Sequence, residues 1–400
     1  MNAPLHGVKI ADFSWVGAGP RATKDLADYG ATVIKIESRQ RLDLGRLSPP
    51  FKNGVRHPDG SAFFAIANTS KRSVTINLSD PRGIEVAKRL VQWADVVVEN
   101  FGQGYMERIG LSWPVLNALR PDIILVSVSV AGRTGPNAGL RGYGNSAAAL
   151  SGLAALSGWP DRPPHMPPFA YGDVVAPIFA TIGVLAALEH RRLTGRGQHV
   201  DVSQVEPLVH ALADRFVEHQ LRGPQPKPGN RVANRAPHGV YPCKGDDQWC
   251  AIAVRDDEEW QRLCEAIAPA LLREERFATM SARKQHENEL DELLSGCTAH
   301  HEKHALANRL SLLGVAAEAV QDGREVFEDP ELAVAGHYVH TAHAVLGDCL
   351  MPGPPLKFSR SDVHVGPAPL LGEHNREVFV DMLGMSDAEV AELVAAGALQ

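Results

Sequence analysis

The first 130 residues alternate short apolar runs with longer amphipathic ones. The apolar runs predict buried strands at residues 8–13, 31–37, 73–78, 95–99 and 122–130. Apolar positions at helical spacing predict helices at 20–29, with Pro20 in its first turn, and at 81–93. Strands that alternate with helices form right-handed βαβ units and a mostly parallel sheet covered on both faces. The predicted fold class is therefore α/β.

The pattern beyond residue 132 predicts loops and tightly packed helices. Glycine and proline mark loops at 133–144 and 160–168. Small residues between these loops predict one closely packed helix at 145–157, and residues 174–192 predict a strongly apolar, buried helix. A strand at 198–203 and a helix that ends near residue 221 follow.

A proline-rich linker precedes a second, smaller domain. Residues 223–237 contain four prolines and two glycines, which predict an extended connection. A β-hairpin at 240–243 and 249–254, followed by charged helices, predicts an α+β domain over 238–330. The segment 331–400 has strand-like pieces and a closing helix that begins at Ser386, whose spacing to Glu389 is that of a capping box.

Composition narrows the class of protein. The 400 residues are 44% hydrophobic and 22% charged with a net charge of −7, typical of a globular protein without a nucleic-acid surface. The longest apolar run has about 15 residues and contains Pro177, short of the ~18 that a membrane span needs. The N-terminus has no signal-peptide pattern, and the five cysteines form no Cys-x-x-Cys pair. We expect a cytoplasmic protein that binds neither membrane nor nucleic acid.

The turn after the first predicted strand is similar to a dinucleotide fingerprint. Gly17 and Gly19 form a Gly-x-Gly, and Glu37 ends the next strand where a ribose-binding acid would stand. Ala22 replaces the third glycine, however, and Pro20 removes an N–H that a pyrophosphate would use. The turn therefore favours a tight strand–helix junction, and an NAD-dependent dehydrogenase is the weaker alternative.

Asp173 is the candidate for chemistry. It is the only Asp, Glu, Lys or Arg between Arg162 and Glu189. An aspartate before an apolar helix is typical of an N-cap, and a desolvated carboxylate at a helix start also suits a nucleophile. The seventeen histidines lie without supporting acidic residues, so we expect no metal site.

Several basic residues lie where open α/β sheets bind ligands. Arg108 and Arg141 follow the carboxyl ends of predicted strands, and Lys71 and Arg72 precede one. Guanidinium and ammonium groups gathered at such an edge suit a polyphosphate.

Motifs spread over nearly the whole chain resemble those of the class III CoA-transferases. They are Gly-Ala-Thr-Val-Ile-Lys-Ile-Glu at 30–37, Asn-Thr-Ser-Lys-Arg-Ser at 68–73, Glu-Asn-Phe-x-x-Gly from 99 with Arg-Ile-Gly-Leu at 108–111, Gly-x-x-Gly-Pro at 132–136, Thr-Gly-Arg-Gly-Gln-His-Val-Asp-Val-Ser at 194–203 and Leu-Gly-Glu-His at 371–374. This family includes formyl-CoA and carnitine CoA-transferases and 2-methylacyl-CoA racemases. The resemblance implies a large Rossmann-like domain built from residues 1–222 and 331–400, the small domain between them, and an interlocked dimer.

The resemblance also assigns residues. Asp173 matches the catalytic aspartate, and Arg108 and Arg141 match positions that line the CoA site, which Lys71 and Arg72 would join. Arg39 is the substitute for an arginine that formyl-CoA transferases carry where Ser38 stands here. The expected substrate pocket contains Val16, Gly17 and Tyr143. Gly17 replaces a glutamine of those enzymes, and residues 229–239 lack their glycine-run loop, which together argue against oxalate and formate.

The expected reaction is transfer of CoA between carboxylic acids through an aspartyl anhydride and an aspartyl-CoA thioester. Residues 12–16 and 157–162 are similar to the benzylsuccinate CoA-transferase subgroup, which implies succinyl-CoA as donor and a dicarboxylate or aryl-alkyl acid as acceptor. Coenzyme A is then a substrate, and no cofactor is bound permanently.

Two alternatives stay open beside CoA transfer. Racemases of the family carry a histidine base where Tyr143 stands, and a phenol with a pKa of about 10 is a poor base at neutral pH. The other alternative is a non-catalytic CoA-binding subunit of a hetero-oligomer formed with a paralogue; a homodimer is the expected assembly of an active chain.

Overall fold

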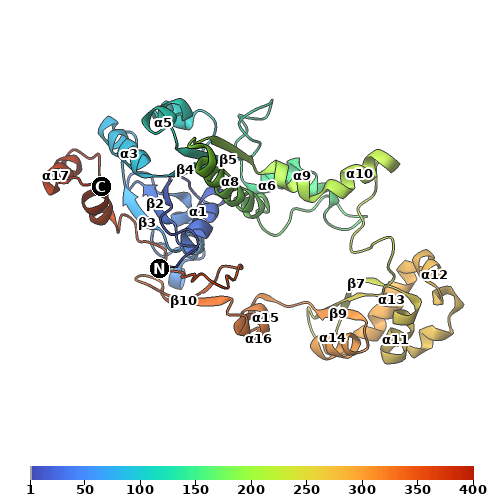
Figure 1. Cartoon of the computed structure of the whole chain (residues 1–400). Coiled ribbons are helices and arrows are strands. Elements are labelled where there is room, and N and C mark those ends of the chain that lie inside the picture. The colour runs from blue at the N-terminus through green and yellow to red at the C-terminus, as the bar shows by residue number, and fades with distance from the viewer. Residues whose placement is uncertain (1) are drawn as a thin grey trace. The chain divides into compact units, whose positions relative to one another are not determined.

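The chain folds into two compact units. The computed structural model describes residues 2–400 (Figure 1). The first unit comprises the chain up to Ala154, Met166–Gly223 and Leu332–Gln400, and the second comprises Ala155–His165 and Pro224–Glu331. Residues 155–165, expected in the large domain, thus belong to the second unit, because Trp159 lies against Gly229 and the carbonyl of Arg162 accepts a hydrogen bond from Lys227.

A six-stranded parallel sheet forms the centre of the first unit. Its strands are β1 (Lys9–Asp12), β2 (Thr32–Glu37), β3 (Arg72–Thr75), β4 (Val96–Glu99), β5 (Ile124–Ser129) and β6 (His199–Ser203). They are ordered β3-β2-β1-β4-β5-β6, and every neighbouring pair is parallel. This is the order of dinucleotide-binding sheets, in which the direction of winding reverses between β1 and β4. The predicted α/β class with a parallel sheet is confirmed.

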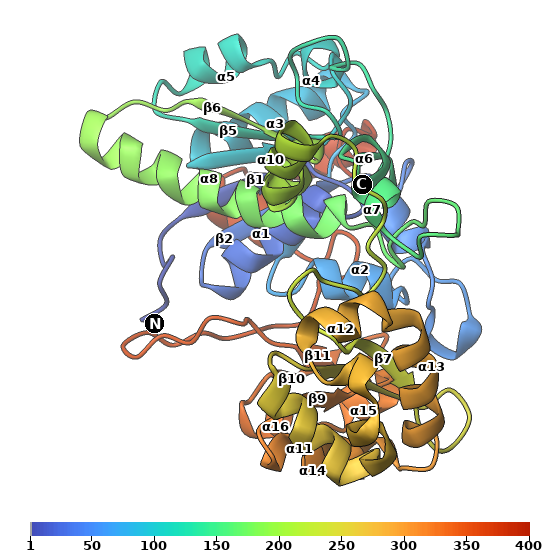
Figure 2. The ribbon, with the colours of Figure 1, turned by 90° about the vertical axis from the view of Figure 1, so that its right-hand side faces the viewer.

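Helices cover both faces of the sheet. On one face lie α1 (Ala18–Asp28) and α8 (Gly172–Thr194), whose small and β-branched residues share a core with β1, β4 and β5 (Figure 2). On the other face lie α3 (Pro81–Trp93), α5 (Trp113–Leu119) and η5 (Glu377–Met382), which share a second core with the strands. The central strands are buried on both sides, as their near-continuous Val and Ile runs predict.

The helix predicted at 145–157 is two helices. They are α6 (Gly144–Leu150) and α7 (Leu153–Leu156), and Gly152 between them has a φ of +86°. A residue in the left-handed region ends an α-helix, and glycine adopts that conformation without strain. The helix predicted up to residue 221 is likewise divided, into α9 (Val205–Ala211) and α10 (Ala213–Arg222).

The helix α8 contradicts the expectation that the chain has no segment long and apolar enough for a membrane. By length and composition alone it is such a helix, with a third of its apolar window buried. Its buried positions include Ala176, Ala180, Val184 and Ala187, which form one stripe against the sheet. A core helix of a sheet protein passes the same test of length and composition.

The second unit has its own sheet and core. Its strands β7 (His238–Pro242), β8 (Trp249–Ala253) and β9 (Ala316–Ala319) are antiparallel and ordered β7-β8-β9. The hairpin predicted at this place is formed by β7 and β8. Around the sheet lie α11 (Asp257–Ile267), α12 (Met280–Gln285), α13 (Glu287–Thr298), α14 (Lys303–Leu312) and α15 (Gly323–Phe327). Trp260, Phe277 and Leu290 are among the buried side chains of this core.

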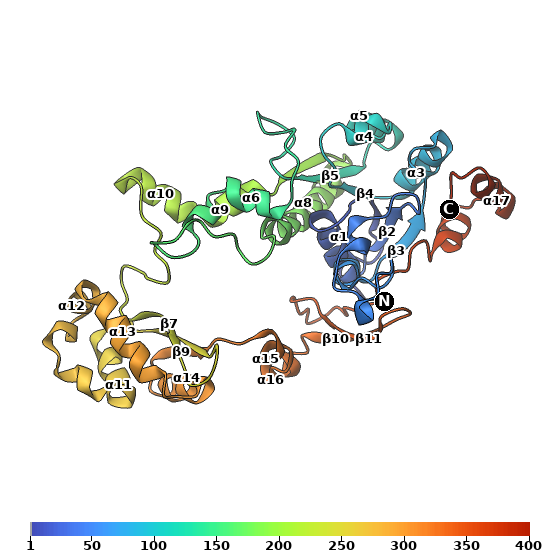
Figure 3. The ribbon, with the colours of Figure 1, turned by 180° about the vertical axis from the view of Figure 1, so that it is seen from behind.

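The C-terminal segment returns to the first sheet. After α16 (Pro330–Val334), the strands β10 (Tyr338–His343) and β11 (Gly347–Pro352) form an antiparallel hairpin. After α17 (Asp387–Ala395), the chain ends near β3 (Figure 3). There Leu399 pairs with Ile76, and the side chain of Thr75 donates to the carbonyl of Gln400. Both ends of the chain therefore complete one hydrophobic core.

Candidate active site

A cavity of ≈ 740 Å³ opens at the carboxyl ends of the central strands. Its walls come from the loops that follow β1, β2, β4, β5 and β6 and from the segment before α6. The loops after β1 and β4 face each other at the point where the strand order reverses, which is where open α/β sheets bind their ligands. The cavity lies wholly within the first unit.

Asp173 lines this cavity as the second residue of α8. Its Oδ2 accepts a hydrogen bond from the N–H of Gly144 (3.1 Å), and its Oδ1 accepts one from Nε2 of Gln204 (2.8 Å). Burial raises the pKa of Asp173 and outweighs these two hydrogen bonds and the charge of Arg21, which lower it. The carboxylate makes no capping bond to α8, so the N-cap interpretation is wrong.

Glycines allow the backbone to close around the Asp173 carboxylate. A Cβ on Gly144 would lie 2.5 Å from the backbone nitrogen of Asp173, and one on Gly172 would lie 2.8 Å from the Cβ of Ala147. A Cβ on Gly17 would lie 3.2 Å from Cγ of Asp173. Side chains at these positions would displace the carboxylate, because the interior is already closely packed around it.

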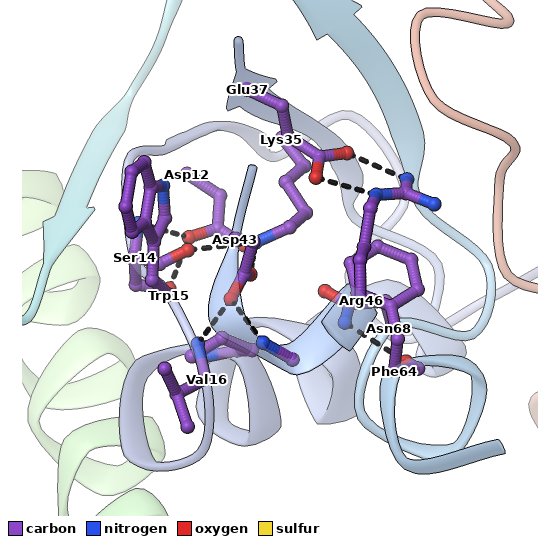
Figure 4. A network of polar contacts seen from close by, with 12 residues as sticks. Asp12, Ser14, Trp15, Val16, Lys35, Glu37, Asp43, Arg46, Phe64 and Asn68 are labelled. Atoms are coloured by element: carbon purple, nitrogen blue, oxygen red, sulfur yellow. Dashed lines mark hydrogen bonds and ion pairs between the residues drawn. The ribbon is translucent and has the colours of Figure 1, made fainter. Parts of the chain in front are cut away.

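The features that imitate a dinucleotide fingerprint serve the fold instead. A Cβ on Gly19 would lie 2.2 Å from the Cβ of Ser14, so packing requires this glycine. Glu37 is buried, and both its carboxylate oxygens accept hydrogen bonds from Arg46 at 2.7 Å (Figure 4). Oε2 also accepts from the hydroxyl of Ser73 (2.7 Å). A carboxylate that is buried and engaged in this way is not accessible to a ribose, which removes the basis of the dehydrogenase alternative.

Three arginines line the cavity. They are Arg108 and Arg141, which were expected at this site, and Arg41, which was not. The guanidinium of Arg41 lies 5.5 Å from the ring of Trp15, and that of Arg108 lies 5.7 Å from the ring of Tyr105. Within residues 2–400 no carboxylate forms an ion pair with these three arginines, and Asp173 is the only acidic residue that lines the cavity. The cavity wall is therefore strongly cationic in a protein of net negative charge.

Three other basic residues predicted for the CoA site, Arg39, Lys71 and Arg72, lie outside the cavity. Arg39 donates from Nη2 to the carbonyl of Leu371 (3.2 Å), and Arg72 pairs with Glu377 (2.6 Å). The contact of these two arginines with CoA stays a prediction.

Lys71 requires a correction. Its Nζ is buried and donates to Asp12 Oδ2 (2.9 Å), Asn68 Oδ1 (2.9 Å) and the carbonyl of Pro20 (2.8 Å). All three donors of the ammonium are thus used inside the fold. Lys71 joins α1 to the strands in this geometry and has no donor left for CoA.

The expected pocket residues Val16, Gly17 and Tyr143 do line the cavity, and Tyr143 is largely exposed. Two further residues of the cavity were not expected from the sequence: Gln204, which follows β6 and holds Asp173, and Asn100. Asn100 lies in one of the motifs quoted above, whereas no local pattern marks Gln204. In residues 2–400 no three His, Cys, Asp or Glu side chains are grouped to hold a metal ion.

Residues 5–375 match the family model described as CoA-transferase family III. The chain belongs to this family. The family membership confirms the resemblance seen in the motifs, and with it that the chain is an enzyme of the CoA-transferase class.

Individual relatives of this family III CoA-transferase agree over nearly the full length. A succinyl-CoA–D-citramalate CoA-transferase from Chloroflexus aurantiacus is 34% identical, with 98% of this chain and 97% of the relative covered. A formyl-CoA:oxalate CoA-transferase from Rhodopseudomonas palustris is 30% identical, with 100% and 98% covered. A crystal structure of a CAIB/BAIF family protein from Brucella suis is 32% identical, with a TM-score of 0.88 over 95% of this chain and 100% of that one.

Proposed function

We propose that this enzyme transfers CoA from an acyl-CoA, with succinyl-CoA as the expected donor, to a second carboxylic acid, and that Asp173 is its nucleophile. One observation carries the proposal: in the described chain, a single desolvated carboxylate lines a cavity whose other charged groups are Arg41, Arg108 and Arg141. The cationic wall suits the phosphates of CoA, and the carboxylate suits covalent exchange of an acyl group.

Transfer proceeds through covalent intermediates on Asp173. A carboxylate oxygen attacks the thioester carbonyl of the donor, the C–S bond breaks, and the products are a mixed anhydride and CoA thiolate. The thiolate then attacks the aspartyl carbonyl, which releases the donor acid and leaves an aspartyl-CoA thioester. The acceptor carboxylate attacks this thioester, the C–S bond breaks, and the products are a second mixed anhydride and CoA thiolate. The thiolate finally attacks the acceptor's carbonyl in that anhydride, which gives the new acyl-CoA and restores the Asp173 carboxylate. No net proton is taken up or released, since every nucleophile and every leaving group is an anion.

The surroundings of Asp173 support this role. Hydrogen bonds from Gly144 and Gln204 fix both carboxylate oxygens. The carboxylate is therefore already oriented before it attacks, which lowers the entropic cost of each step. Partial burial strips water from the carboxylate, and that makes it a stronger nucleophile than an exposed aspartate. Exclusion of water also protects the anhydride and the thioester from hydrolysis.

The donor and acceptor acids are proposed only as chemical classes. The name of one relative pairs succinyl-CoA with D-citramalate, and the subgroup resemblance independently implies succinyl-CoA. Dicarboxylates suit a cavity with more than one cationic group, because the distal carboxylate needs a charge partner of its own. We therefore expect succinyl-CoA as donor and a dicarboxylate or aryl-alkyl acid as acceptor.

The racemase alternative lacks a second base. Among the residues that the structure describes, no histidine lines the cavity, and the residue at the position of the racemase base, Tyr143, is largely exposed. Exchange of a hydrogen α to the thioester needs groups that remove and return a proton. The non-catalytic subunit alternative would leave the cavity chemistry around Asp173 without a use.

Trapping of the covalent intermediate tests the proposal. The purified chain is mixed with succinyl-CoA and hydroxylamine, and we expect a hydroxamate at residue 173, located by mass spectrometry of peptides. Asp173→Asn should lower transfer at least about a hundredfold, or ~2.7 kcal/mol in the barrier. Asp161→Asn, on an exposed side chain of the second unit, is the matched control.

Three results would count against the proposal. They are a hydroxamate on another residue, an Asp173→Asn enzyme with more than about a hundredth of the rate, and α-deuterium exchange in D2O without transfer. A panel of acyl-CoA donors and carboxylic acids, read by the mass of the new thioester, identifies the acid pair.

A further inference from the structure

The turn between β1 and α1 holds Val16 in an unfavourable conformation. The φ of Val16 is +65°, in the left-handed region. A β-branched residue there is a true outlier, because its Cβ substituents crowd the backbone. Such strain persists only where the surrounding structure imposes the conformation, and it gathers at functional sites. Val16 lines the cavity, and the next residue, Gly17, lies against the Asp173 carboxylate.

Side chains from three other segments fix this turn, and Figure 4 shows two of them, Asp43 and Lys35. Asp43 Oδ1 accepts a hydrogen bond from the N–H of Val16 (2.9 Å). Asn100 accepts from the N–H of Trp15 and donates to its carbonyl, both at 2.7 Å. Lys35 Nζ donates to the carbonyl of Ser14 (2.7 Å). Consecutive backbone groups of the turn are therefore held by side chains rather than by neighbouring backbone.

Asp43 is also held in place from its other side. Its Oδ2 lies 2.9 Å from Lys35 Nζ, and both side chains are almost completely buried. Burial alone would lower the pKa of Lys35, but attraction to Asp43, Asp12 and Glu37 outweighs burial and raises that pKa. The ammonium therefore stays charged, and it fixes Asp43 with Oδ1 directed at Val16.

The same carboxylate joins two walls of the cavity. Asp43 Oδ1 also accepts the N–H of Gly45 (2.8 Å), where it caps the short helix η1 (Leu44–Leu47). On either side of Asp43, Leu42 and Leu44 line the cavity, whereas Asp43 itself does not. Asp43 Oδ1 thus connects the cavity wall formed by the loop after β1 to the wall formed by the loop after β2.

We propose that Asp43, charge-paired with Lys35, is a positioning residue for Asp173. Its bond to the N–H of Val16 keeps the turn in the left-handed conformation, and the turn in that conformation places Gly17 against the Asp173 carboxylate. Without the bond, Val16 relaxes toward an ordinary φ and Gly17 withdraws. The Asp173 carboxylate keeps its hydrogen bonds from Gly144 and Gln204 but loses the packing contact that limits its movement on the side of Gly17. The inference rests on the proposed function of Asp173 as nucleophile.

A pair of double variants isolates the hydrogen bond from the charge. In Asp43→Asn with Lys35→Met, the asparagine Oδ1 still accepts from Val16 and Gly45, and no unpaired charge is left. In Asp43→Leu with Lys35→Met, the shape is similar but the acceptor is gone. The two variants differ only at residue 43, asparagine or leucine, so the loss of the ion pair and of the Lys35 bond to Ser14 is common to both and cancels between them.

The measurement separates chemistry from binding. The rate at which succinyl-CoA labels Asp173 in a single turnover should fall about ten- to a hundredfold in the Asp43→Leu double variant relative to the Asp43→Asn double variant. The dissociation constant for CoA should agree between the two within about threefold, because no residue that meets CoA has changed. Equal labelling rates would overturn the inference, and so would a loss confined to CoA affinity.

A second measurement tests the inference if the Asp43→Leu double variant does not fold. Amide hydrogen exchange at Val16 should be as slow in the Asp43→Asn double variant as in the wild-type enzyme, because the asparagine still accepts from that N–H. Fast exchange at Val16 in the folded wild-type enzyme would overturn the inference. The wild-type enzyme is labelled first, and absence of label at residue 173 refutes the proposed function. If residue 173 is labelled but the two Asp43 variants label at equal rates, only the positioning role is refuted.

Discussion

At the residue scale, the charge state of Asp173 sets a pH limit on the reaction. Burial raises the pKa of Asp173 above its ordinary value of 3.8, and only the ionised form is a nucleophile. The reaction rate should therefore fall as pH falls through this raised pKa. The acidic limb of the pH–rate profile, where the rate falls, then lies at higher pH than it would for an exposed aspartate. The hydrogen bond from Gln204 favours the ionised form and limits the rise.

We predict that Gln204→Leu moves this acidic limb to higher pH. Loss of the amide donor leaves the burial effect less opposed, so the pKa of Asp173 rises further. The measurement is kcat/KM for transfer against pH. Gln92→Leu, an exposed glutamine on α3, is the control and should leave the profile in place. An unchanged or lowered limb in the Gln204→Leu enzyme would contradict the assigned contact.

The arginines of the cavity are individual residues whose contribution to CoA binding can be measured. Arg108→Ala or Arg141→Ala should weaken CoA binding by roughly 1.5–3 kcal/mol, the scale of a charge-assisted contact. The loss should shrink with dephospho-CoA for an arginine that meets the 3′-phosphate. Calorimetric titration measures it, with Arg89→Ala on the outer side of α3 as control. Equal losses for CoA and for a pantetheine thioester would exclude a phosphate contact.

At the element scale, the site depends on how closely α6 approaches the start of α8. Gly144 begins α6, gives its N–H to the Asp173 carboxylate, and has no room for a Cβ. Gly172 makes the matching close approach from the side of α8. The two glycines therefore position Asp173 through backbone contact, which side-chain chemistry alone does not reveal.

We predict that Gly144→Ala lowers the transfer rate about a hundredfold, since displacement of a reacting group by about 1 Å has an effect of that size. Gly139→Ala is the matched control: it lies in the loop before α6, is exposed, and a Cβ there would meet nothing within 4 Å. Thermal unfolding of both variants separates a displaced carboxylate from a lost fold. Full activity in the Gly144→Ala enzyme would show that the contact does not position Asp173.

At the scale of the whole molecule, α8 and α10 leave apolar side chains uncovered. Ile178, Phe179, Ile182 and Leu185 of α8 are exposed, and so are Phe216, Val217 and Leu221 of α10. Several large apolar side chains exposed on one helix are typical of a subunit interface. Together with the family resemblance, they support the prediction of an interlocked dimer.

We predict that size exclusion with light scattering gives about twice 43.2 kDa, with no monomer on dilution. Ile178→Glu together with Ile182→Glu should abolish this species, because two carboxylates would be buried without partners. Val55→Glu, at an exposed apolar residue outside both helices, should not. A stable, active monomer at nanomolar concentration would refute the dimer.

The sequence by itself determined the elements that local patterns specify. Apolar runs predicted five of the parallel strands, and the sixth was expected at residues 198–203. The order of the motifs identified the family. Such patterns are visible in the sequence because strand burial and backbone turns are specified by a few neighbouring residues. It also marked Asp173 as the lone charged residue of its segment. It did not find the break at Gly152, since an isolated glycine inside a helical pattern is compatible with a continuous helix.

Only the tertiary structure decided which marked residues share the cavity. Arg39 and Arg41 are two positions apart, and the fold places Arg41 in the cavity wall while Arg39 bonds to the C-terminal segment. Lys71 looked like a phosphate ligand and is buried against Asp12, whereas Gln204 carried no signal and holds Asp173. These outcomes depend on contacts between strands and loops that are distant in sequence, and local residue chemistry does not encode them.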